Sequence, residues 1–190
     1  MKVAVLGGSF DPVHIGHLFL AVEVLSQTPV EHVMFLPAAS PPHKAKGPSV
    51  SDAHRLAMLN LAIGDHDRFQ LNTWELEKGG VSYTIDSIRE LMDRGTIPDT
   101  PAFIVGDDLL PGMHSWKKVD ELLSTVHLII GRREEAPVPE FVPDYTCIDN
   151  LPLRVSSSDL RQRIASSRPF RYLVPEAVYD YIVAHRLYMS

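Results

Sequence analysis

The sequence lacks the features that mark secreted and membrane proteins. Cysteine occurs only once, at Cys147, so no disulfide can form within the chain. The longest apolar run extends from Leu18 to Val22, whereas a helix that spans a membrane needs about 20 apolar residues. The N-terminal apolar segment reaches Gly7 too early for a signal peptide. We therefore expect a cytoplasmic protein without a membrane partner.

Basic charge is also scarce. The chain has 18 Lys and Arg residues against 24 Asp and Glu residues, which gives a net charge of -6 at pH 7. An acidic protein repels polyanions, so we expect no nucleic-acid partner. Residues 154–171, here called the basic segment, differ from this average because they contain five arginines and one aspartate. A local net charge of +4 on an acidic chain indicates a site for a small anion.

Short apolar segments alternate along the chain with segments of helical periodicity. Expected strands cover residues 2–6, 32–36, 69–76, 102–105, 127–130 and 145–148. Expected helices cover residues 15–25, 52–63, 84–94 and 119–123, and two more begin near Ser158 and Pro175. This alternation predicts a Rossmann-like α/β fold, a doubly wound parallel sheet with C-terminal helices. We expect one domain over residues 1–190, with its C-terminal helical element at about 156–190.

The first loop has the features of an anion site. It reads GGSFDPVHIGH from Gly7 to His17, between a buried strand and a helix. Its glycines let a ligand approach the main chain, and the helix N-terminus supplies N–H groups and a positive dipole end. His14 and His17 lie three residues apart in the first turn and could donate hydrogen bonds to a phosphoryl group. Two alternatives stay open, namely capping or packing histidines, and a metal site completed by Asp11.

A second candidate anion site lies in the basic segment. The sequence SSSDLR from Ser156 to Arg161 combines hydroxyl groups, a helix N-terminus and an arginine in the first turn. A serine cluster in this position often serves only as a helix N-cap. We favour anion binding because the cluster coincides with the basic segment, for which an acidic protein has no evident structural need.

These two motifs together resemble the HxGH nucleotidyltransferase superfamily. Four further motifs resemble bacterial nicotinate-nucleotide adenylyltransferases, in order over nearly the whole chain. They are PxxxPPHK at 37–44, EL at 75–76 with GxSYTxD at 80–86, GxD at 106–108 with WK at 116–117, and LxPxxVxxYI at 173–182. The resemblance implies transfer of an adenylyl group from ATP to nicotinate mononucleotide, which yields nicotinate adenine dinucleotide and pyrophosphate. It also implies in-line attack without a covalent enzyme intermediate.

The resemblance further implies which residues bind ATP. They are Gly8, Ser9, Phe10, His14, His17, Gly106, Asp108, Ser157, Ser158 and Arg161. Among them, Ser157, Ser158 and Arg161 would hold the β- and γ-phosphates. The implied catalytic set is His14, His17, Lys44 and Arg161. Mg²⁺ would be held through the ATP phosphates, without a metal site made by the protein itself.

The acceptor side is implied in the same way. Trp116 is similar to the family aromatic residue that stacks on the pyridine ring. Tyr83, Thr84 and Lys117 would surround the nicotinate carboxylate, and His43 and Lys44 would reach the mononucleotide phosphate. Without the resemblance, Trp116 would read as a core aromatic, Lys44 as a solvated charge and Asp108 as a helix cap.

Two rival functions remain at this point. A phosphopantetheine adenylyltransferase would share the first loop and the serine cluster, although it has no need for an aromatic platform beside an anion pocket. A non-catalytic nucleotide-binding regulator would keep the fold and bind ATP without turnover. The sequence leaves the oligomeric state open, a homo-oligomer included.

Overall fold

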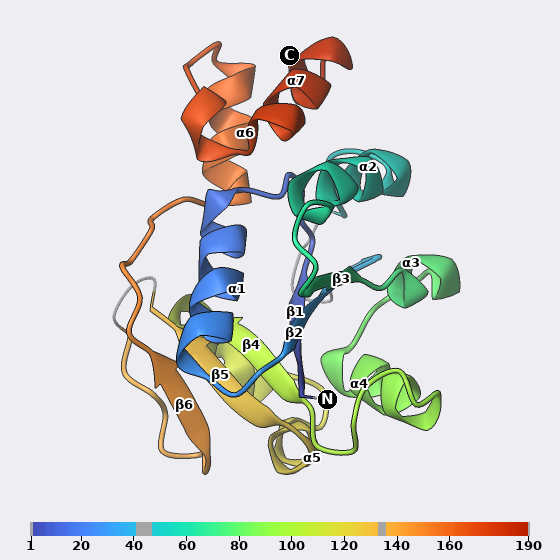
Figure 1. Ribbon diagram of the computed structural model, residues 1–190, viewed down its shortest axis with the longest axis vertical. Helices are drawn as coiled ribbons and strands as arrows, with labels where there is room; N and C mark the ends of the chain where they lie inside the picture. Colours follow the sequence, from blue (N-terminus) through green and yellow to red (C-terminus); the bar gives the residue numbers. More distant parts are fainter. Residues whose placement is uncertain (1, 41–46, 133–135, 190) are drawn as a thin grey trace.

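A single parallel sheet forms the centre of the protein (Figure 1). The computed structural model describes residues 2–40, 47–132 and 136–189. Its strands are β1 (Val3–Gly8), β2 (His32–Pro37), β3 (Phe69–Leu71), β4 (Ala102–Gly106), β5 (His127–Gly131) and β6 (Tyr145–Ile148). They lie in the order β3-β2-β1-β4-β5-β6, and every neighbouring pair is parallel. This is the doubly wound order, so the predicted Rossmann-like sheet is confirmed.

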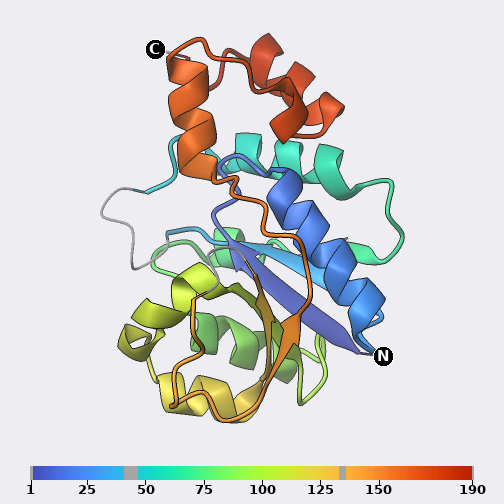
Figure 2. The same ribbon diagram turned by 90° about the vertical axis from the view of Figure 1, so that its left-hand side faces the viewer.

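Helices connect the strands and cover both faces of the sheet (Figures 1 and 2). The α-helices are α1 (Ile15–Gln27), α2 (Asp52–Ile63), α3 (Trp74–Lys78), α4 (Thr84–Asp93), α5 (Val119–Thr125), α6 (Ser157–Ala165) and α7 (Glu176–Ala184). The 3-10 helices are η1 (Asp107–Ser115) and η2 (Arg171–Leu173). Among the described residues, no helix is long and apolar enough to cross a membrane.

Alternate residues of the central strands face two separate hydrophobic clusters. In β1, Ala4 and Leu6 belong to the cluster that includes residues of α1 and α2. Val3 and Val5 point to the other face and belong to the cluster that includes residues of α4 and α5. Because both faces are covered, the strand consists of consecutive apolar residues and shows no polar alternation.

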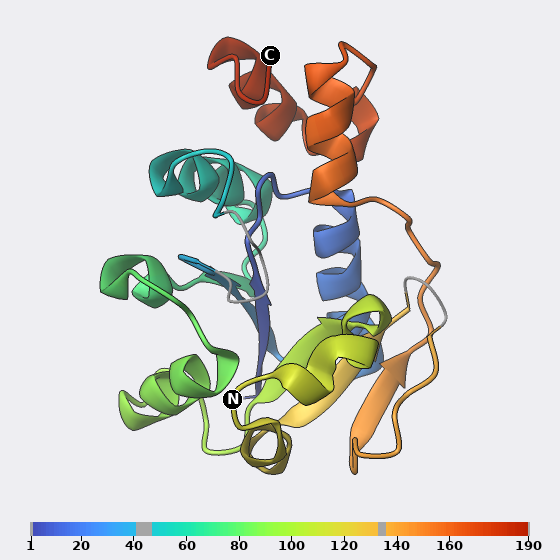
Figure 3. The ribbon, with the colours of Figure 1, turned by 180° about the vertical axis from the view of Figure 1, so that it is seen from behind.

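The C-terminal helices lie at one end of the molecule, away from the N-terminus (Figures 1 and 3). Leu160 of α6 and Val178 of α7 are fully buried and belong to the same hydrophobic cluster as α1 and α2. The three views agree that the first turn of α6 approaches the first turn of α1 (Figures 1 to 3). This packing brings the two candidate anion motifs of the sequence together.

One expected strand is wrong in its second half. Only Phe69–Leu71 pairs with β2, and the chain then turns into the short helix α3. The Asn72 side chain accepts a hydrogen bond from the main-chain N–H of Trp74 at 3.0 Å, a local turn that competes with strand pairing. Of the expected strand, Trp74 to Leu76 are therefore helical. The sequence also gave no indication of η1, which follows β4 directly.

Candidate active site

A cavity of about 370 Å³ opens at the carboxyl ends of β1 and β4. The strand order reverses between these two strands, and ligands of doubly wound sheets bind at such a point. Most of the predicted site residues line it, namely Gly8, Ser9, Phe10, His14, His17, Tyr83, Thr84, Asp108, Trp116, Lys117, Ser157 and Ser158. Another cavity, of about 520 Å³, lies at α6 and α7 and contains none of them. The position at the strand ends makes the smaller cavity the candidate active site.

The two histidines of the first loop stack on each other. Their ring centroids are 3.7 Å apart, with an angle of 26° between the ring planes. His14 is the N-cap of α1, and its main-chain N–H lies 3.3 Å from Nδ1 of His17. Because Nδ1 of His17 accepts this hydrogen bond, the neutral ring carries its proton on Nε2. The imidazole can therefore donate a hydrogen bond from Nε2.

The glycine between these histidines leaves room for the His14 ring. A Cβ atom at Gly16 would lie 3.1 Å from Cε1 and Nδ1 of the His14 ring. That distance is too short for an ordinary van der Waals contact, so any side chain at this position would push the His14 ring. The HxGH spacing thus combines two functions. Histidines three residues apart meet on one helix face, and the glycine leaves room for the first ring.

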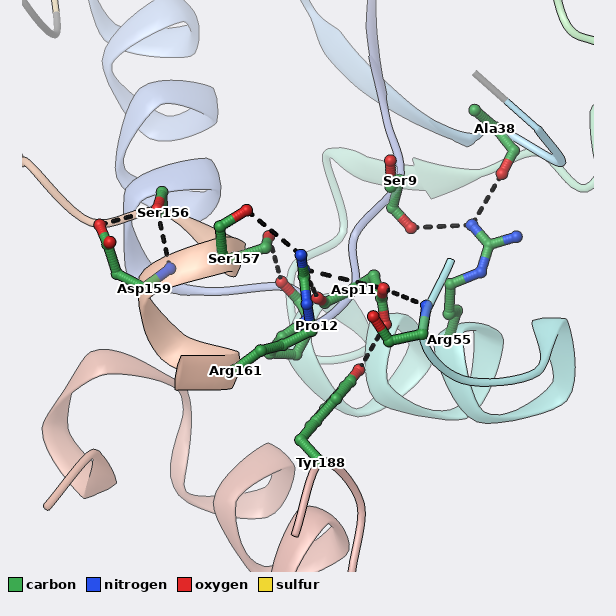
Figure 4. A network of polar contacts seen from close by, with 12 residues as sticks. Ser9, Asp11, Pro12, Ala38, Arg55, Ser156, Ser157, Asp159, Arg161 and Tyr188 are labelled. Carbon is green, nitrogen blue, oxygen red and sulfur yellow. Dashed lines mark hydrogen bonds and ion pairs between the residues drawn. The ribbon is translucent and has the colours of Figure 1, made fainter. Parts of the chain in front are cut away.

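The N-terminus of α6 is joined to the same loop (Figure 4). Ser156 is the N-cap, and its Oγ accepts a hydrogen bond from the main-chain N–H of Asp159 at 3.1 Å. The hydroxyl of Ser157 donates to the main-chain oxygen of Pro12 at 2.9 Å. The first turns of α1 and α6 therefore lie on either side of the first loop, and both direct positive dipole ends at the cavity mouth. Such a pair of helix ends suits a polyphosphate.

Arg161 contacts this loop from α6. Its Nη1 donates to the main-chain oxygen of Asp11 at 2.6 Å, and its Nη2 donates to the Ser158 hydroxyl at 3.2 Å. Arg161 does not line the cavity itself, and the same is true of Gly106 at the end of β4. Ser156 of the serine cluster is a helix N-cap, the structural alternative considered in the sequence analysis. The cluster also lines the cavity.

The acceptor half of the cavity lies at the start of α4 and the end of η1. Tyr83 is the N-cap of α4, and Trp116 follows η1 and packs edge-on against Phe103. Nζ of Lys117 lies 2.7 Å from Oδ2 of Asp86 and 4.7 Å from the centroid of the Tyr83 ring. The lysine charge is therefore already paired beside the position where the resemblance puts the nicotinate carboxylate.

Three residues at the cavity or in contact with the first loop escaped the sequence analysis in whole or in part. Arg55 is fully buried, and its Nη1 donates to the main-chain oxygens of Ser9 at 2.8 Å and Ala38 at 2.7 Å. Glu75, which was named above only as part of a motif, is buried at the cavity and accepts from the Ser87 hydroxyl at 2.6 Å. Burial raises the pKa of the Glu75 carboxyl, against the opposing effects of the Ser87 hydrogen bond and of Lys78 and Arg55.

The third missed residue is Tyr188, whose hydroxyl donates to Oδ1 of Asp11 at 2.8 Å. The two residues are 177 positions apart, so no local spacing could have revealed the contact. Arg55 was equally hard to find, because an arginine on a helix usually marks a solvated face. Glu75 had one signal, namely its place in a motif that precedes the acceptor residues.

Two further points of the sequence analysis concern the acceptor phosphate and a metal ion. His43 and Lys44 lie outside the described residues. Within the described part of the chain, no group of three or more His, Cys, Asp or Glu side chains could hold a metal ion. Asp11, His14 and His17 do not form such a group in the described structure.

Comparison with known proteins agrees with this geometry. A family model described as cytidylyltransferase-like matches residues 5–163. A Synechococcus protein named "Probable nicotinate-nucleotide adenylyltransferase" is 40% identical over 100% of this chain and 98% of its own length. A Symbiobacterium thermophilum protein of the same name is 41% identical over 99% of this chain and 95% of its own length.

A solved structure shows the same fold. Nicotinic acid mononucleotide adenylyltransferase of Plasmodium falciparum, complexed with NaAD, superimposes with a TM-score of 0.81 at 20% identity. The match covers 98% of this chain and 97% of that one. The full-length identity to the bacterial proteins shows what the resemblance of the motifs implied: the chain belongs to the nicotinate-nucleotide adenylyltransferase family of cytidylyltransferase-like proteins.

Proposed function

We propose that this protein transfers the adenylyl group of ATP to nicotinate mononucleotide, with release of pyrophosphate, in NAD biosynthesis. The observation that carries the proposal is the cavity at the β1–β4 switch point, which has two helix N-termini on one side and Trp116 with Tyr83 on the other. One half suits a triphosphate, and the other suits an aromatic ring that bears an anion.

In the triphosphate half, we propose that the main chain of Gly8, Ser9 and Phe10 contacts ATP. The Nε2–H of His17 would donate to the α-phosphate, where negative charge develops as the mononucleotide phosphate attacks in line. His14 would hold the His17 ring in place through the stacked contact at 3.7 Å. No side chain needs to form a covalent intermediate, because positioning and charge stabilisation supply the catalysis.

The leaving pyrophosphate would be held at the other helix. Ser157 and Ser158 line the cavity at the N-terminus of α6, and Arg161 contacts Ser158 from farther along the same helix. A guanidinium group and a helix N-terminus together stabilise the charge that accumulates on the departing oxygens. Gly106 and Asp108, at the end of β4 and the start of η1, would meet the ribose of the adenosine.

Mg²⁺ fits this site as a companion of ATP. The described residues include no three-carboxylate or histidine cage, and Mg²⁺ is commonly held through substrate phosphates with few protein ligands. When bound, the ion would neutralise charge on the phosphate oxygens. Orientation of the nucleotide would come from the loop glycines, the histidines and the α6 end.

In the acceptor half, the pyridine ring would stack on Trp116 and its carboxylate would face the start of α4. Tyr83 and Thr84 lie at the N-terminus of α4 and line the cavity, and the first N–H groups of a helix have no partner within the helix. A carboxylate accepts hydrogen bonds from such N–H groups with both oxygens, whereas the NH₂ of a carboxamide is a donor and finds no acceptor among them. We therefore expect the protein to prefer nicotinate mononucleotide over nicotinamide mononucleotide. The role of His43 and Lys44 at the mononucleotide phosphate rests on their match to the family motif.

Two further assignments follow from the same proposal. Residues 1–190 would act as one nucleotidyltransferase domain, since α6 and α7 share a hydrophobic cluster with α1 and α2. The compartment would be the cytoplasm, where the free thiol of the exposed Cys147 stays reduced.

The test is a steady-state comparison of acceptors. Purified protein with Mg-ATP should release pyrophosphate on addition of nicotinate mononucleotide. Turnover with nicotinamide mononucleotide should be at least about tenfold less efficient, because a mispaired polar group costs about 1–3 kcal/mol. Release on addition of phosphopantetheine, and not with either pyridine mononucleotide, would make the protein a phosphopantetheine adenylyltransferase. ATP binding without turnover on any of these acceptors would favour a regulator.

A further inference from the structure

Asp11 is a buried junction between distant parts of the chain (Figure 4). Its side chain is only 3% exposed. Oδ1 accepts a hydrogen bond from the Tyr188 hydroxyl at 2.8 Å, and Oδ2 accepts from the main-chain N–H of Ser49 at 2.6 Å. A buried carboxylate is stable only when donors satisfy its oxygens, and here each oxygen has one close neutral donor.

The Arg161 guanidinium lies beside this carboxylate without forming a tight pair. Its Nη1 is 3.7 Å from Oδ2 of Asp11, beyond hydrogen-bond distance, although Nη1 donates to the main-chain oxygen of the same residue at 2.6 Å. The arginine charge is thus only partly compensated by Asp11. A guanidinium in this state retains donor capacity and attraction for a phosphate.

Tyr188 is well suited to keep Asp11 and Arg161 from forming a tight ion pair. It follows α7 in a left-handed conformation with φ of 61°, which directs the ring back toward the first loop. Burial and the neighbouring Asp11 raise the pKa of its hydroxyl, so the phenol remains a proton donor at any ordinary pH. If the hydroxyl were lost, Oδ1 of Asp11 would lose its donor, and the cation beside the carboxylate that could replace this donor is Arg161.

We propose that Tyr188 is a positioning residue for the triphosphate half of the site. By donating to Asp11, it prevents that carboxylate from capturing Arg161 in a full ion pair, and so keeps the guanidinium available to the β- and γ-phosphates. The inference rests on the proposed function, because it assumes that Arg161 contacts those phosphates. It adds a residue from the C-terminal end of the chain that the site motifs do not include.

The experiment is Tyr188→Phe, with Tyr172→Phe as the matched control, since the Tyr172 side chain is 87% exposed. Calorimetric titration gives Kd for Mg-ATP and for pyrophosphate in each variant. We expect both Kd values to rise about tenfold in Tyr188→Phe, the effect of one lost hydrogen bond to a charged group, and to stay unchanged in Tyr172→Phe. These titrations need no acceptor, so they remain informative even if transfer to nicotinate mononucleotide fails.

A rescue distinguishes positioning from simple structural support. Asp11→Asn removes the charge that competes for Arg161, so adding it to Tyr188→Phe should restore the affinity for Mg-ATP to within about threefold of the original. A structural role predicts the opposite, since two losses in one junction would weaken binding further. The KM for nicotinate mononucleotide should remain unchanged in Tyr188→Phe, because Asp11 lies on the triphosphate side.

Three outcomes would overturn the inference. One is an unchanged Kd for Mg-ATP in a Tyr188→Phe variant whose unfolding temperature equals that of the unaltered protein. Another is an equal loss of affinity for ATP and for the mononucleotide. The third is a double variant that binds more weakly than Tyr188→Phe. Should Tyr188→Phe fail to fold, Asp11→Asn alone decides, because it should bind Mg-ATP at least as tightly as the unaltered protein, and a tenfold weakening would contradict the proposal.

Discussion

The Ser87 hydroxyl oxygen lies 2.6 Å from Oε1 of Glu75 and 3.3 Å from the main-chain oxygen of Tyr83. A serine has one hydroxyl proton, so it cannot donate fully to both acceptors at once. The shorter contact is the donation to Glu75, so the contact with Tyr83 is the weaker of the two. Burial nevertheless raises the pKa of the Glu75 carboxyl, because desolvation outweighs the Ser87 hydrogen bond.

Glu75→Gln should therefore change how stability depends on pH. A carboxyl with a raised pKa binds more protons in the folded state than in the unfolded state, so its contribution to stability is present below the unfolded pKa of 4.5 and is lost as pH rises through the folded pKa. Urea unfolding at a series of pH values should show the unaltered protein losing stability relative to Glu75→Gln above pH 4.5.

The control for this experiment is Glu77→Gln on the same helix, where the side chain is exposed. Its stability should follow that of the unaltered protein across the whole range. A constant difference between Glu75→Gln and the unaltered protein at every pH would show that Glu75 does not titrate in this window.

His17→Ala should reduce kcat by about 100-fold to 1,000-fold, the usual effect of losing one donor to developing charge. The KM for ATP should change far less, because the glycine-rich loop and the α6 end remain. His66→Ala is a suitable control, since His66 stacks on Phe69 and does not line the cavity. A similar kcat in both histidine variants would remove His17 from the catalytic set.

Trp116→Ala should raise the KM for nicotinate mononucleotide about tenfold, because stacking of a base on an aromatic side chain is worth about 1–3 kcal/mol. The Kd for Mg-ATP should remain near its original value. The chain has two tryptophans, and Trp74 is not in the cavity lining, so Trp74→Ala provides the comparison. An equal rise in the KM for nicotinate mononucleotide and in the Kd for Mg-ATP would indicate that Trp116 supports the fold and does not form the ring platform.

Arg55→Ala should destabilise the protein by about 3 kcal/mol, as expected when a buried charged donor is removed from its acceptors. The Ser9 and Ala38 oxygens would lose their partner, so the first loop should also bind ATP more weakly. Arg94→Ala removes an exposed pair with Glu90 and should cost at most about 1 kcal/mol. Chemical denaturation gives the free energy of unfolding of both variants. A larger loss in Arg55→Ala than in Arg94→Ala shows that the buried hydrogen bonds of Arg55 matter, and not only its charge.

The sheet could be predicted from sequence because its central strands are buried on both faces. Consecutive apolar residues in β1 and β4 have few alternative structures, and each of the two strands ends in glycine. The strand expected over residues 69–76 was wrong because its second half depends on one side-chain contact, from Asn72 to the next turn. Such local competition is decided by geometry that a residue pattern does not contain.

The same distinction holds for the site. His14 and His17 could be paired because they are three residues apart on a helix, where spacing fixes proximity. The contact between Asp11 and Tyr188 depends on how α7 packs against the rest of the chain, and the buried guanidinium of Arg55 depends on how α2 packs. Neither follows from periodicity, and both required the folded structure.

The contacts of Asp11 with the C-terminal part of the chain also determine when during synthesis the phosphate-binding side can form. During synthesis the first loop leaves the ribosome long before α6 and the residues after α7. The Asp11 carboxylate then has neither its phenol donor nor the guanidinium beside it, since Arg161 and Tyr188 are translated much later. The phosphate-binding side is therefore complete only after the C-terminal helices have been synthesised.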